Sequence, residues 1–332
     1  MVFYCYQAYN ITAQKIDWLF QNQIKVTKEP PIMEKITISE HVEQMFKEQD
    51  YTVSGQIEID GQPVKYAVVF DGHGTDSVIR FIRNIKPDKM NEIMASPCPG
   101  TTMFHYINYA TPKLCIRGEC SGSTMCLARI FSTHVEIINV GDSQAVVFKN
   151  GQIEFISETH DYGNAKEKER LEQEGRIYRA VDSSSVKIVN ETEMHVAKAF
   201  YIVHKNDGVQ LAVSQALGHD GKTGICPDRT VIPYEQADDI RIILGSDGFF
   251  DMVMREKEED KFVTQDLLDL VDMQGDAIMK RTLDRWLQKW EMYYTLTDPT
   301  VSMPGQFLKK QCDDVAIVKI VISPETSISV FN

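Results

Sequence analysis

The chain has 332 residues, of which 43% are hydrophobic and 25% charged, so it can build the core of one large domain or two ordinary ones. Its net charge of −13 argues against nucleic acid as the main partner, because phosphate backbones require a basic surface. No stretch approaches the roughly 18 uncharged apolar residues of a membrane span, and the N-terminus lacks a secretory signal, so we expect no membrane partner. We therefore expect an intracellular, cytoplasmic protein, and nothing in the sequence argues against the nucleus.

The first part of the chain predicts an extension, a hairpin and a helix. Residues 1–34 resemble nothing that follows, and we interpret them as an N-terminal extension of a domain over residues 35–332. Residues 51–71 are typical of a β-hairpin that turns at Asp60-Gly61. From Asp76 onward apolar residues recur at helical spacing, and Pro87 ends this helix.

The middle of the chain predicts a meander, a helix and a long loop. Apolar and alternating segments indicate successive antiparallel strands over residues 121–156. Residues 165–174 predict a charged helix that Gly175 ends, and its charges indicate only a solvated face. Residues 178–205 predict an irregular, elaborated loop.

The C-terminal part predicts two further strands with a helix between them. The strands cover residues 239–246 and 314–322. The amphipathic helix between them is marked by Met279, Leu283, Trp286, Leu287, Trp290 and Tyr294. Because the strands form hairpins with helices inserted between groups of them, we expect an α+β fold of antiparallel sheets covered by helices. Seven cysteines without a C-x-x-C pair predict reduced, mostly buried thiols.

Five aspartates stand where a hydrophobic strand begins or ends: Asp50, Asp71, Asp142, Asp247 and Asp313. One interpretation is that each merely caps a turn, and the segment Asp71-Gly72-His73-Gly74 is by itself typical of a turn. A carboxylate at the edge of a sheet is costly to desolvate unless it meets a cation. Converging aspartates with few basic neighbours therefore predict divalent ions, and ligands that are all oxygen favour magnesium or manganese.

Motifs in a fixed order carry a resemblance to a known family. They are KEQD (47–50), VVFDGHG (68–74), SGSTMCLARI (121–130), NVGDSQAV (139–146), LAVSQALG (211–218), ILGSDGFFD (243–251) and CDDVAIVKI (312–320). Across roughly residues 45–322 the chain resembles the metal-dependent serine/threonine protein phosphatases of the protein phosphatase 2C type. The resemblance implies a sandwich of two antiparallel β-sheets flanked by pairs of α-helices, in four layers, with a two-metal site at one edge.

The resemblance assigns a role to each aspartate at a strand end. It places the family's first acidic position on Asp50 and its bridging metal ligand on Asp71, with the carbonyl oxygen of Gly72 as a further ligand. The aspartates of the family's Ser-Asp-Gly and closing Asp-Asn motifs match Asp247 and Asp313.

The resemblance also implies cofactors and a reaction. Two Mg²⁺ or Mn²⁺ ions would bind, and Asp142 matches a position that in relatives helps to hold a weaker third ion. A hydroxide bridging the two ions would attack phosphoserine or phosphothreonine of a phosphoprotein directly. His73 resembles the general acid that gives the leaving oxygen its proton.

The chain departs from the family pattern in three places. Met45 stands where the family commonly has a phosphate-binding arginine, and the nearby Lys47 is a point charge without a bidentate fork. The family's Ser-Arg-Ala-Leu-Gly-Asp reads Ser-Gln-Ala-Leu-Gly-His-Asp over residues 214–220, so the arginine is absent and the aspartate is displaced. Asp314 replaces the asparagine that usually follows Asp313.

These departures leave an alternative from another functional class. The chain could be a catalytically silent, phosphatase-like domain that binds or regulates a partner protein; a hydrolase of small phosphoesters is a third interpretation, for which the sequence offers no nucleotide or sugar pocket. The aspartates favour the enzyme, and Met45 favours the binding module. The sequence does not set the oligomeric state.

Overall fold

A computed structural model describes residues 36–110, 121–176, 178–183, 187–189, 194–196, 199–204, 210–254, 265–293 and 302–324. The predicted N-terminal extension over residues 1–34 lies outside these residues. All elements named below belong to one compact unit over residues 33–332.

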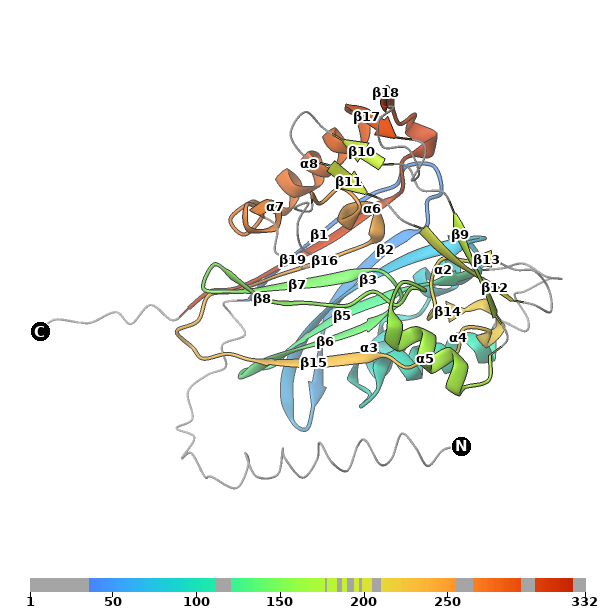
Figure 1. Ribbon diagram of the computed structural model, residues 1–332. Helices are drawn as coiled ribbons and strands as arrows, with labels where there is room; N and C mark the ends of the chain where they lie inside the picture. Colours follow the sequence, from blue (N-terminus) through green and yellow to red (C-terminus); the bar gives the residue numbers. More distant parts are fainter. Residues whose placement is uncertain are drawn as a thin grey trace, which may run out of the picture. The chain divides into compact units, whose positions relative to one another are not determined.

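A five-stranded antiparallel sheet forms one layer of this unit (Figure 1). In spatial order its strands are β1 (Ile36–Glu43), β19 (Val315–Ile322), β16 (Ile240–Gly245), β7 (Gln144–Lys149) and β8 (Gln152–Ile156). The central strands β16 and β19 were predicted from their apolar runs, and they are buried because both faces of the sheet are covered.

A seven-stranded antiparallel sheet forms the second layer. Its strands are β14 (Leu217–Gly218), β4 (Ser121–Ser123), β3 (Gln62–Gly74), β5 (Met125–Ile130), β6 (His134–Val140) and β15 (Asp228–Pro233), with β2 (Asp50–Ile59) paired to β3. The predicted hairpin of β2 and β3 is confirmed. Asp60 and Gly61 at its turn have φ of 52° and 74°, the left-handed conformation that a tight hairpin turn requires.

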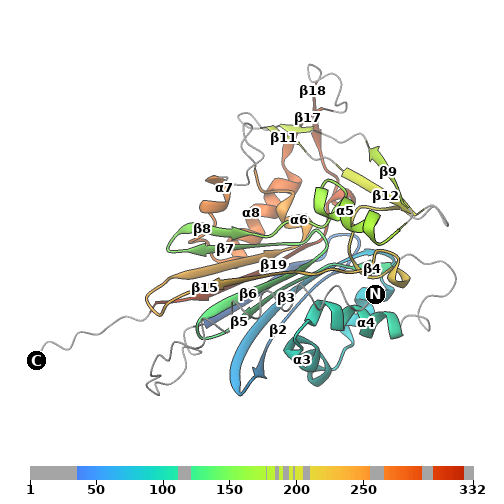
Figure 2. The same ribbon diagram turned by 60° about the horizontal axis from the view of Figure 1, so that its bottom comes forward.

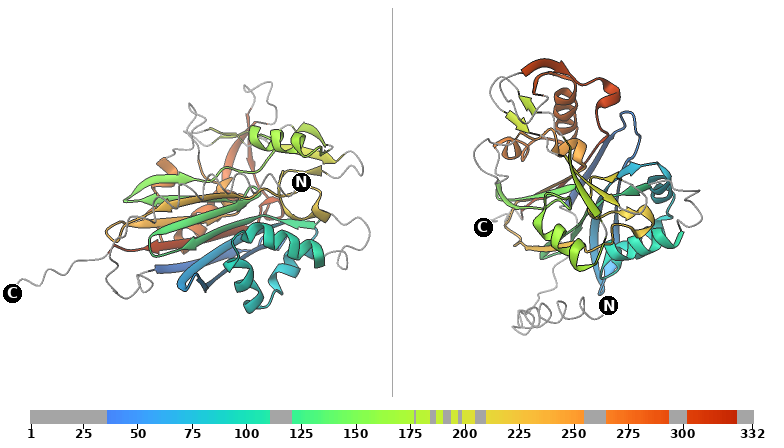
Figure 3. Two further views of the ribbon diagram at one scale, coloured as in Figure 1. Left: turned by 90° about the horizontal axis from the view of Figure 1, so that it is seen from below. Right: turned by 45° about the vertical axis from the view of Figure 1, so that its right-hand side comes forward.

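Helices cover the outer face of each sheet (Figure 2). Helices α2 (Ser77–Arg83), α3 (Pro87–Ala95) and α4 (Pro99–Ala110) share one buried apolar cluster with the seven-stranded sheet. Helices α6 (Asp247–Phe250), α7 (Gln265–Leu268) and α8 (Gly275–Leu287) share another with the five-stranded sheet. The two groups of helices lie on opposite sides of the paired sheets (Figure 3), and β19 and β16 contact β3 across the interface. The predicted four-layer α+β sandwich is therefore confirmed.

The predicted strand ends and meander need two corrections. Strand β3 does not end at Asp71, because it continues to Gly74 and pairs there with β4, so the segment 71–74 is strand and not a turn. The predicted meander over 121–156 is divided between the sheets, since β6 belongs to one sheet and β7 to the other. Gly141, with φ of 98°, lies at the crossing and lets the chain change direction beside Asp142.

Two segments of the second half are more regular than predicted. The loop predicted over 178–205 contains strands β9 (Tyr178–Ser183), β10 (Lys187–Val189), β11 (Met194–Val196) and β12 (Ala199–His204). Strands β9 and β12 form a small sheet with β13 (Gln210–Leu211), whereas β10 and β11 form another with β17 (Lys289–Tyr293) and β18 (Ser302–Gln306).

Three helices also differ from their predictions. The C-terminal helix ends at Leu287, so Trp290 lies in strand β17 and not on the helix, and Tyr294 lies outside the described residues. Pro87 begins α3 as well as ending the preceding segment, because proline fits the first turn of a helix. The charged helix α5 (Ala165–Gln173) has a buried side as well as a solvated one, because Glu167 is only 5% exposed.

Candidate metal centre

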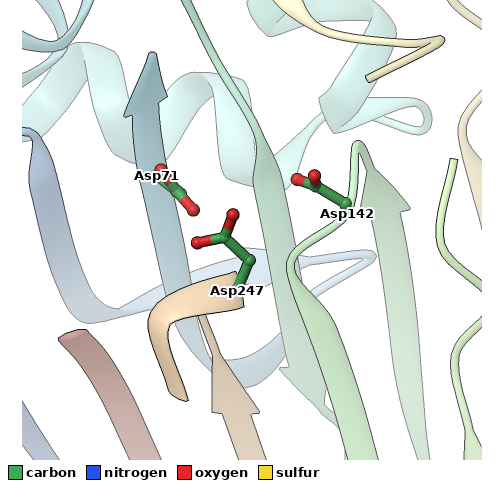
Figure 4. Close-up of side chains that lie close together, drawn as sticks. All are labelled: Asp71, Asp142 and Asp247. Atoms are coloured by element: carbon green, nitrogen blue, oxygen red, sulfur yellow. The ribbon is translucent and has the colours of Figure 1, made fainter. Parts of the chain in front are cut away.

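Three carboxylates converge at one edge of the sandwich. Asp71 lies in β3, Asp142 follows β6 at the crossing between the sheets, and Asp247 is the first residue of α6. One oxygen from each of these side chains lies within 4.8 Å of the others. Figure 4 shows the Asp71 and Asp247 carboxylates facing each other, with the Asp142 carboxylate directed toward them. Aspartates that are far apart in the sequence therefore meet where the two sheets come together.

The protonation of these carboxylates is strongly perturbed. Burial and the charge of Asp247 hold the pKa of Asp71 and of Asp142 well above the ordinary range. Burial and the charge of Asp313 raise the pKa of Asp247 to about 6. Three largely enclosed carboxylates at this separation, of which Asp142 and Asp247 are half-buried, repel each other when ionised, so a cation is needed to hold them all in the charged form. Their oxygen ligands and charge fit a hard divalent ion such as magnesium or manganese.

Asp50 and Asp313 adjoin this cluster in different ways. Asp50 pairs with Asp71 in the ladder between β2 and β3, and its side chain is 2% exposed. Its Oδ2 atom is buried and has no hydrogen-bond partner among the described residues. Asp313 instead accepts bonds from the ammonium group of Lys47 at both carboxylate oxygens, each at 2.8 Å. The Oδ2 atom of Asp50 is thus open to a cation, whereas both carboxylate oxygens of Asp313 already bond to one.

Each Asp-Gly pair of the site has a steric reason for its glycine. The amide of Gly72 donates to the carbonyl of Gln49 at 3.0 Å, and a Cβ atom at Gly72 would lie 2.8 Å from that carbonyl oxygen. A Cβ atom at Gly248 would collide with the carbonyl oxygen of Asp314. The glycines thus let neighbouring backbones approach closely enough to place Asp71 and Asp247.

Asp314 organises the loop before β2. One of its oxygens accepts from the amide of Met45 at 2.6 Å, and the other accepts from the amide of Gln49 at 2.7 Å. The Asp314 side chain is 1% exposed and fixes the loop between these residues. The Met45 side chain packs against the apolar cluster beneath α6 to α8. The position where the family commonly has a phosphate-binding arginine therefore has a packing role in this chain. The sequence indicated only extra charge at Asp314 and did not predict this role.

His73, the predicted general acid, lies on β3 beside a second histidine. Its Nδ1 atom is 2.9 Å from Nε2 of His219. Burial, with a contribution from the charge of Lys47, lowers the pKa of His73 to about 4. His219 was not predicted as a site residue. It stands directly after Gly218, at the position where the family's Ser-Arg-Ala-Leu-Gly-Asp motif has its aspartate.

A third histidine, His160, supports the turn that carries Asp142. Its Nδ1 atom accepts from the amide of Gly141 at 3.1 Å, and its Nε2 atom lies 3.1 Å from Oδ2 of Asp228. An Nδ1 atom that accepts leaves the proton on Nε2, where it donates to Asp228. The sequence did not indicate this role, because it depends on two contacts that are distant along the chain: the amide of Gly141 at Nδ1 and Asp228 at Nε2.

The chain matches known proteins over most of its described length. The family described as "Protein phosphatase 2C" matches residues 39–269. The chain is similar to "Protein phosphatase 1B" of Homo sapiens, with 32% identity over 41% of this chain and 26% of that protein. It is also similar to "Probable protein phosphatase 2C member 13, mitochondrial" of Oryza sativa, with 27% identity over 63% of this chain and 54% of that protein. The chain thus spans about a quarter to half of these relatives.

Solved structures share the fold. The structure entitled "Structure of a C.elegans sex determining protein" has a TM-score of 0.55 and 18% identity over 93% of this chain and 70% of that one. A "serine-threonine phosphatase 2C from Toxoplasma gondii" has a TM-score of 0.50 and 16% identity over 89% and 96%. None of the helices in the described ranges combines the length and apolar character that crossing a membrane requires.

Proposed function

This chain belongs to the protein phosphatase 2C family, and from that membership and its carboxylate cluster we propose that it hydrolyses phosphoserine and phosphothreonine in phosphoproteins. The observation that carries the proposal is the convergence of Asp71, Asp142 and Asp247, whose pKa values are all raised. Such a cluster lowers the free energy of unfolding when no cation is present, and bound divalent cations would neutralise it and use it for hydrolysis. We propose the cytoplasm as the setting of this activity.

The proposed ligands are the carboxylates at the sheet edge and one carbonyl. Asp71, Asp142 and Asp247 would hold Mg²⁺ or Mn²⁺, with Asp50, Asp313 and the carbonyl oxygen of Gly72 completing a site for two ions and Asp142 serving a weaker third. When bound, the ions would neutralise phosphoryl oxygens and activate water for direct attack on phosphorus. The unpartnered Oδ2 of Asp50 supports this assignment, because a buried carboxylate oxygen favours a partner.

His73 is the proposed general acid. The bond between Nε2 and its proton would break as the proton passes to the departing seryl or threonyl oxygen. The lowered pKa of His73 keeps the imidazole neutral near pH 7 in the protein alone. A bound phosphate dianion would oppose that effect, because a nearby negative charge stabilises the imidazolium.

Lys47 is the proposed phosphate-binding residue in place of the absent arginine. Its ammonium group uses two of its three N–H donors on Asp313, which leaves one for a phosphate oxygen. The side chain is 51% exposed and lies next to the carboxylates, so a substrate can reach it.

The test is phosphate release from a phosphothreonine peptide with Mn²⁺ and with excess chelator. We expect release only with the metal. Calorimetric titration of Mn²⁺ in parallel separates the candidates. If Mn²⁺ binds and no phosphate is released, the silent binding module, which the packing of Met45 favours, replaces the enzyme. Equal release in chelator would contradict the metal-dependent mechanism.

A further inference from the structure

His219 contacts His73 through a hydrogen bond and a ring stack. The Nδ1 atom of His73 and the Nε2 atom of His219 are 2.9 Å apart, the ring centroids are 4.7 Å apart, and the ring planes differ by 16°. The His219 side chain is 3% exposed, so the contact lies inside the protein. One of these two nitrogens donates and the other accepts, because a hydrogen bond between them contains one proton.

The backbone around the two rings is shaped to hold them. Gly122 pairs with His73 in the ladder between β3 and β4. A Cβ atom at Gly122 would collide with Nε2 of His219 and would lie 2.8 Å from Cε1 of His73. His219 has a φ of 48°, which is uncommon for a residue other than glycine, and it follows Gly218 with a φ of 84°. The chain therefore accepts a strained conformation to bring this ring to His73.

A buried network anchors the segment that carries His219. Glu167 on α5 accepts from the hydroxyl of Ser214 at 2.5 Å and from the side-chain amide of Gln215 at 2.9 Å. The carbonyl oxygen of the Gln215 side chain accepts from the amide of Cys226 at 2.7 Å. These bonds fix both ends of the turn around His219 without involving the carboxylate cluster.

We propose that His219 is a positioning residue whose Nε2 accepts the Nδ1–H of His73, which leaves Nε2 of His73 as the nitrogen that exchanges a proton with the substrate. The proposal rests on the proposed function of His73. In the reaction step the Nε2–H bond of the His73 imidazolium breaks and its electron pair stays on the ring. The proton joins the departing oxygen, which keeps the electrons of the broken phosphorus–oxygen bond, while a lone pair of water forms the new bond to phosphorus and both water protons leave with the product as dihydrogen phosphate. The Nδ1–H bond to His219 persists throughout.

One observation supports this direction of the bond. The Nε2 atom of His73 is buried and has no hydrogen-bond partner among the described residues, whereas Nδ1 is bonded to His219, so Nε2 is the ring nitrogen that remains for a reacting group. An imidazolium that gives up its Nε2 proton keeps the proton on Nδ1, and that N–H can only donate to His219.

The direction of the hydrogen bond can be measured without any activity. In protein with ¹⁵N-labelled histidine and Mg²⁺, long-range ¹H–¹⁵N spectra distinguish the two neutral tautomers of His73, whose signals are identified by their loss in His73→Gln. We expect the Nδ1–H tautomer in the parent and a mixture in His219→Leu. The Nε2–H tautomer in the parent would overturn the proposal, because His219 would then be the donor.

Matched variants separate orientation from packing. His219→Leu removes the acceptor, whereas His219→Gln keeps an oxygen acceptor on a side chain of similar reach. We expect His219→Leu to reduce kcat/KM for a phosphothreonine peptide about 10–100-fold, as for other orienting partners of functional histidines, with a much smaller loss on p-nitrophenyl phosphate. His219→Gln should recover most of the loss, and the surface variant His105→Gln should match the parent. Equal losses in His219→Leu and His219→Gln on both substrates would indicate packing alone.

Two further results distinguish failure of this proposal from failure of the proposed function. Combining His219→Leu with His73→Gln should cause no loss beyond that of His73→Gln, because His219 acts through His73. Additive losses would refute the positioning role while leaving the phosphatase intact. If the parent releases no phosphate, the proposed function fails, and the tautomer measurement still decides whether His219 accepts from His73.

Discussion

Two groups of buried or half-buried charges in the sandwich are treated in opposite ways. Glu136 in β6 accepts from Arg129 at 2.8 Å and also from Arg229. Burial raises its pKa, but the bonds and charges of Arg229 and Arg129 outweigh that effect, so the pKa of Glu136 is lowered. At the end of the same strand, Asp142 joins a cluster in which every pKa is raised.

The difference separates charge that the fold itself neutralises from charge that it leaves unpaired. The chain neutralises Glu136 with its own arginines, so this group stabilises the fold in any solution that keeps it ionised. It leaves Asp71, Asp142 and Asp247 without an equivalent ion pair among the described residues, so their charge is unfavourable until a cation binds. The carboxylate cluster is therefore expected to lower stability when metal is absent and to raise it when metal is present.

The largest expected effect is that of Asp247→Asn on catalysis. Loss of this carboxylate should weaken Mn²⁺ binding and reduce phosphate release by about 10²–10³-fold or more, a loss typical for removal of a charge-stabilising group. In metal-free solution the same change should raise the melting temperature, because it removes repulsion with Asp71. Calorimetry, peptide assays and thermal scans with and without metal measure these effects.

The matched control is Asp284→Asn on the exposed face of α8, where the aspartate is paired with Lys280. It should leave both activity and metal affinity unchanged. If Asp247→Asn binds Mn²⁺ as tightly as the parent does, Asp247 is not a ligand.

The largest expected effect on stability is that of Glu136→Gln. Removing one partner of a buried ion pair leaves the other charge uncompensated, which typically costs about 3–5 kcal/mol in the free energy of unfolding. Urea unfolding should show this loss, while Mn²⁺ affinity should be unchanged. The exposed pair of Lys166 and Glu158 supplies the comparison, and Glu158→Gln should cost at most about 1 kcal/mol. If Glu136→Gln weakened Mn²⁺ binding as much as Asp247→Asn does, the two charge groups would be coupled.

The two groups should also give opposite pH dependence in metal-free protein. The pKa of Asp247 is higher in the folded protein than its ordinary value of 3.8, so its contribution to stability falls as the pH rises from about 3.8 toward 6. The pKa of Glu136 is lower in the folded protein than 4.5, so its contribution is present above that value and is lost as the pH falls through the folded pKa.

Unfolding curves across this pH range test the assignment. Asp247→Asn should flatten the decline between pH 4 and 6, and Glu136→Gln should flatten the loss below 4.5. Saturating Mn²⁺ should reverse the first trend, because metal binding requires ionised carboxylates. If Asp247→Asn leaves the slope between pH 4 and 6 unchanged, the cluster does not store charge repulsion in the folded protein.

The sheet sandwich and the carboxylates were predictable because their signals are local. Apolar runs marked the central strands, and Asp-Gly pairs marked the positions of Asp71 and Asp247, although β3 continues past Asp71 to Gly74. Those glycines reflect close backbone approach, a constraint that remains visible in the sequence. Strand β1 was not predicted, because its pattern ITISEHVE mixes exposed and half-buried positions, and its pairing with β19 is distant along the chain.

The supporting residues of the site were not predictable, because their roles depend on tertiary contacts. Asp314 fixes the loop before β2, and Glu167 anchors the segment of His219 from a helix whose charges indicated only a solvated face. The sequence alone does not show whether a charged side chain is solvated or hydrogen-bonded to a buried amide. The same reason explains why Met45 was interpreted by its alignment position and not by its packing.

The smallest expected effect concerns the phosphate-binding residue. Lys47→Ala should raise KM for phosphopeptides about tenfold with kcat less affected, the pattern of a lost interaction that binds substrate and transition state alike. It should also tighten Mn²⁺ binding, because Asp313 loses the cation that now occupies both of its oxygens. Lys47→Arg should keep the KM of the parent, since the guanidinium retains the charge. Met45→Arg is the informative comparison: its side chain packs against the core cluster, so we expect lower stability and little change in KM. If Met45→Arg instead lowers KM severalfold and Lys47→Ala leaves it unchanged, the arginine position of the family retains its function here and Lys47 serves only Asp313.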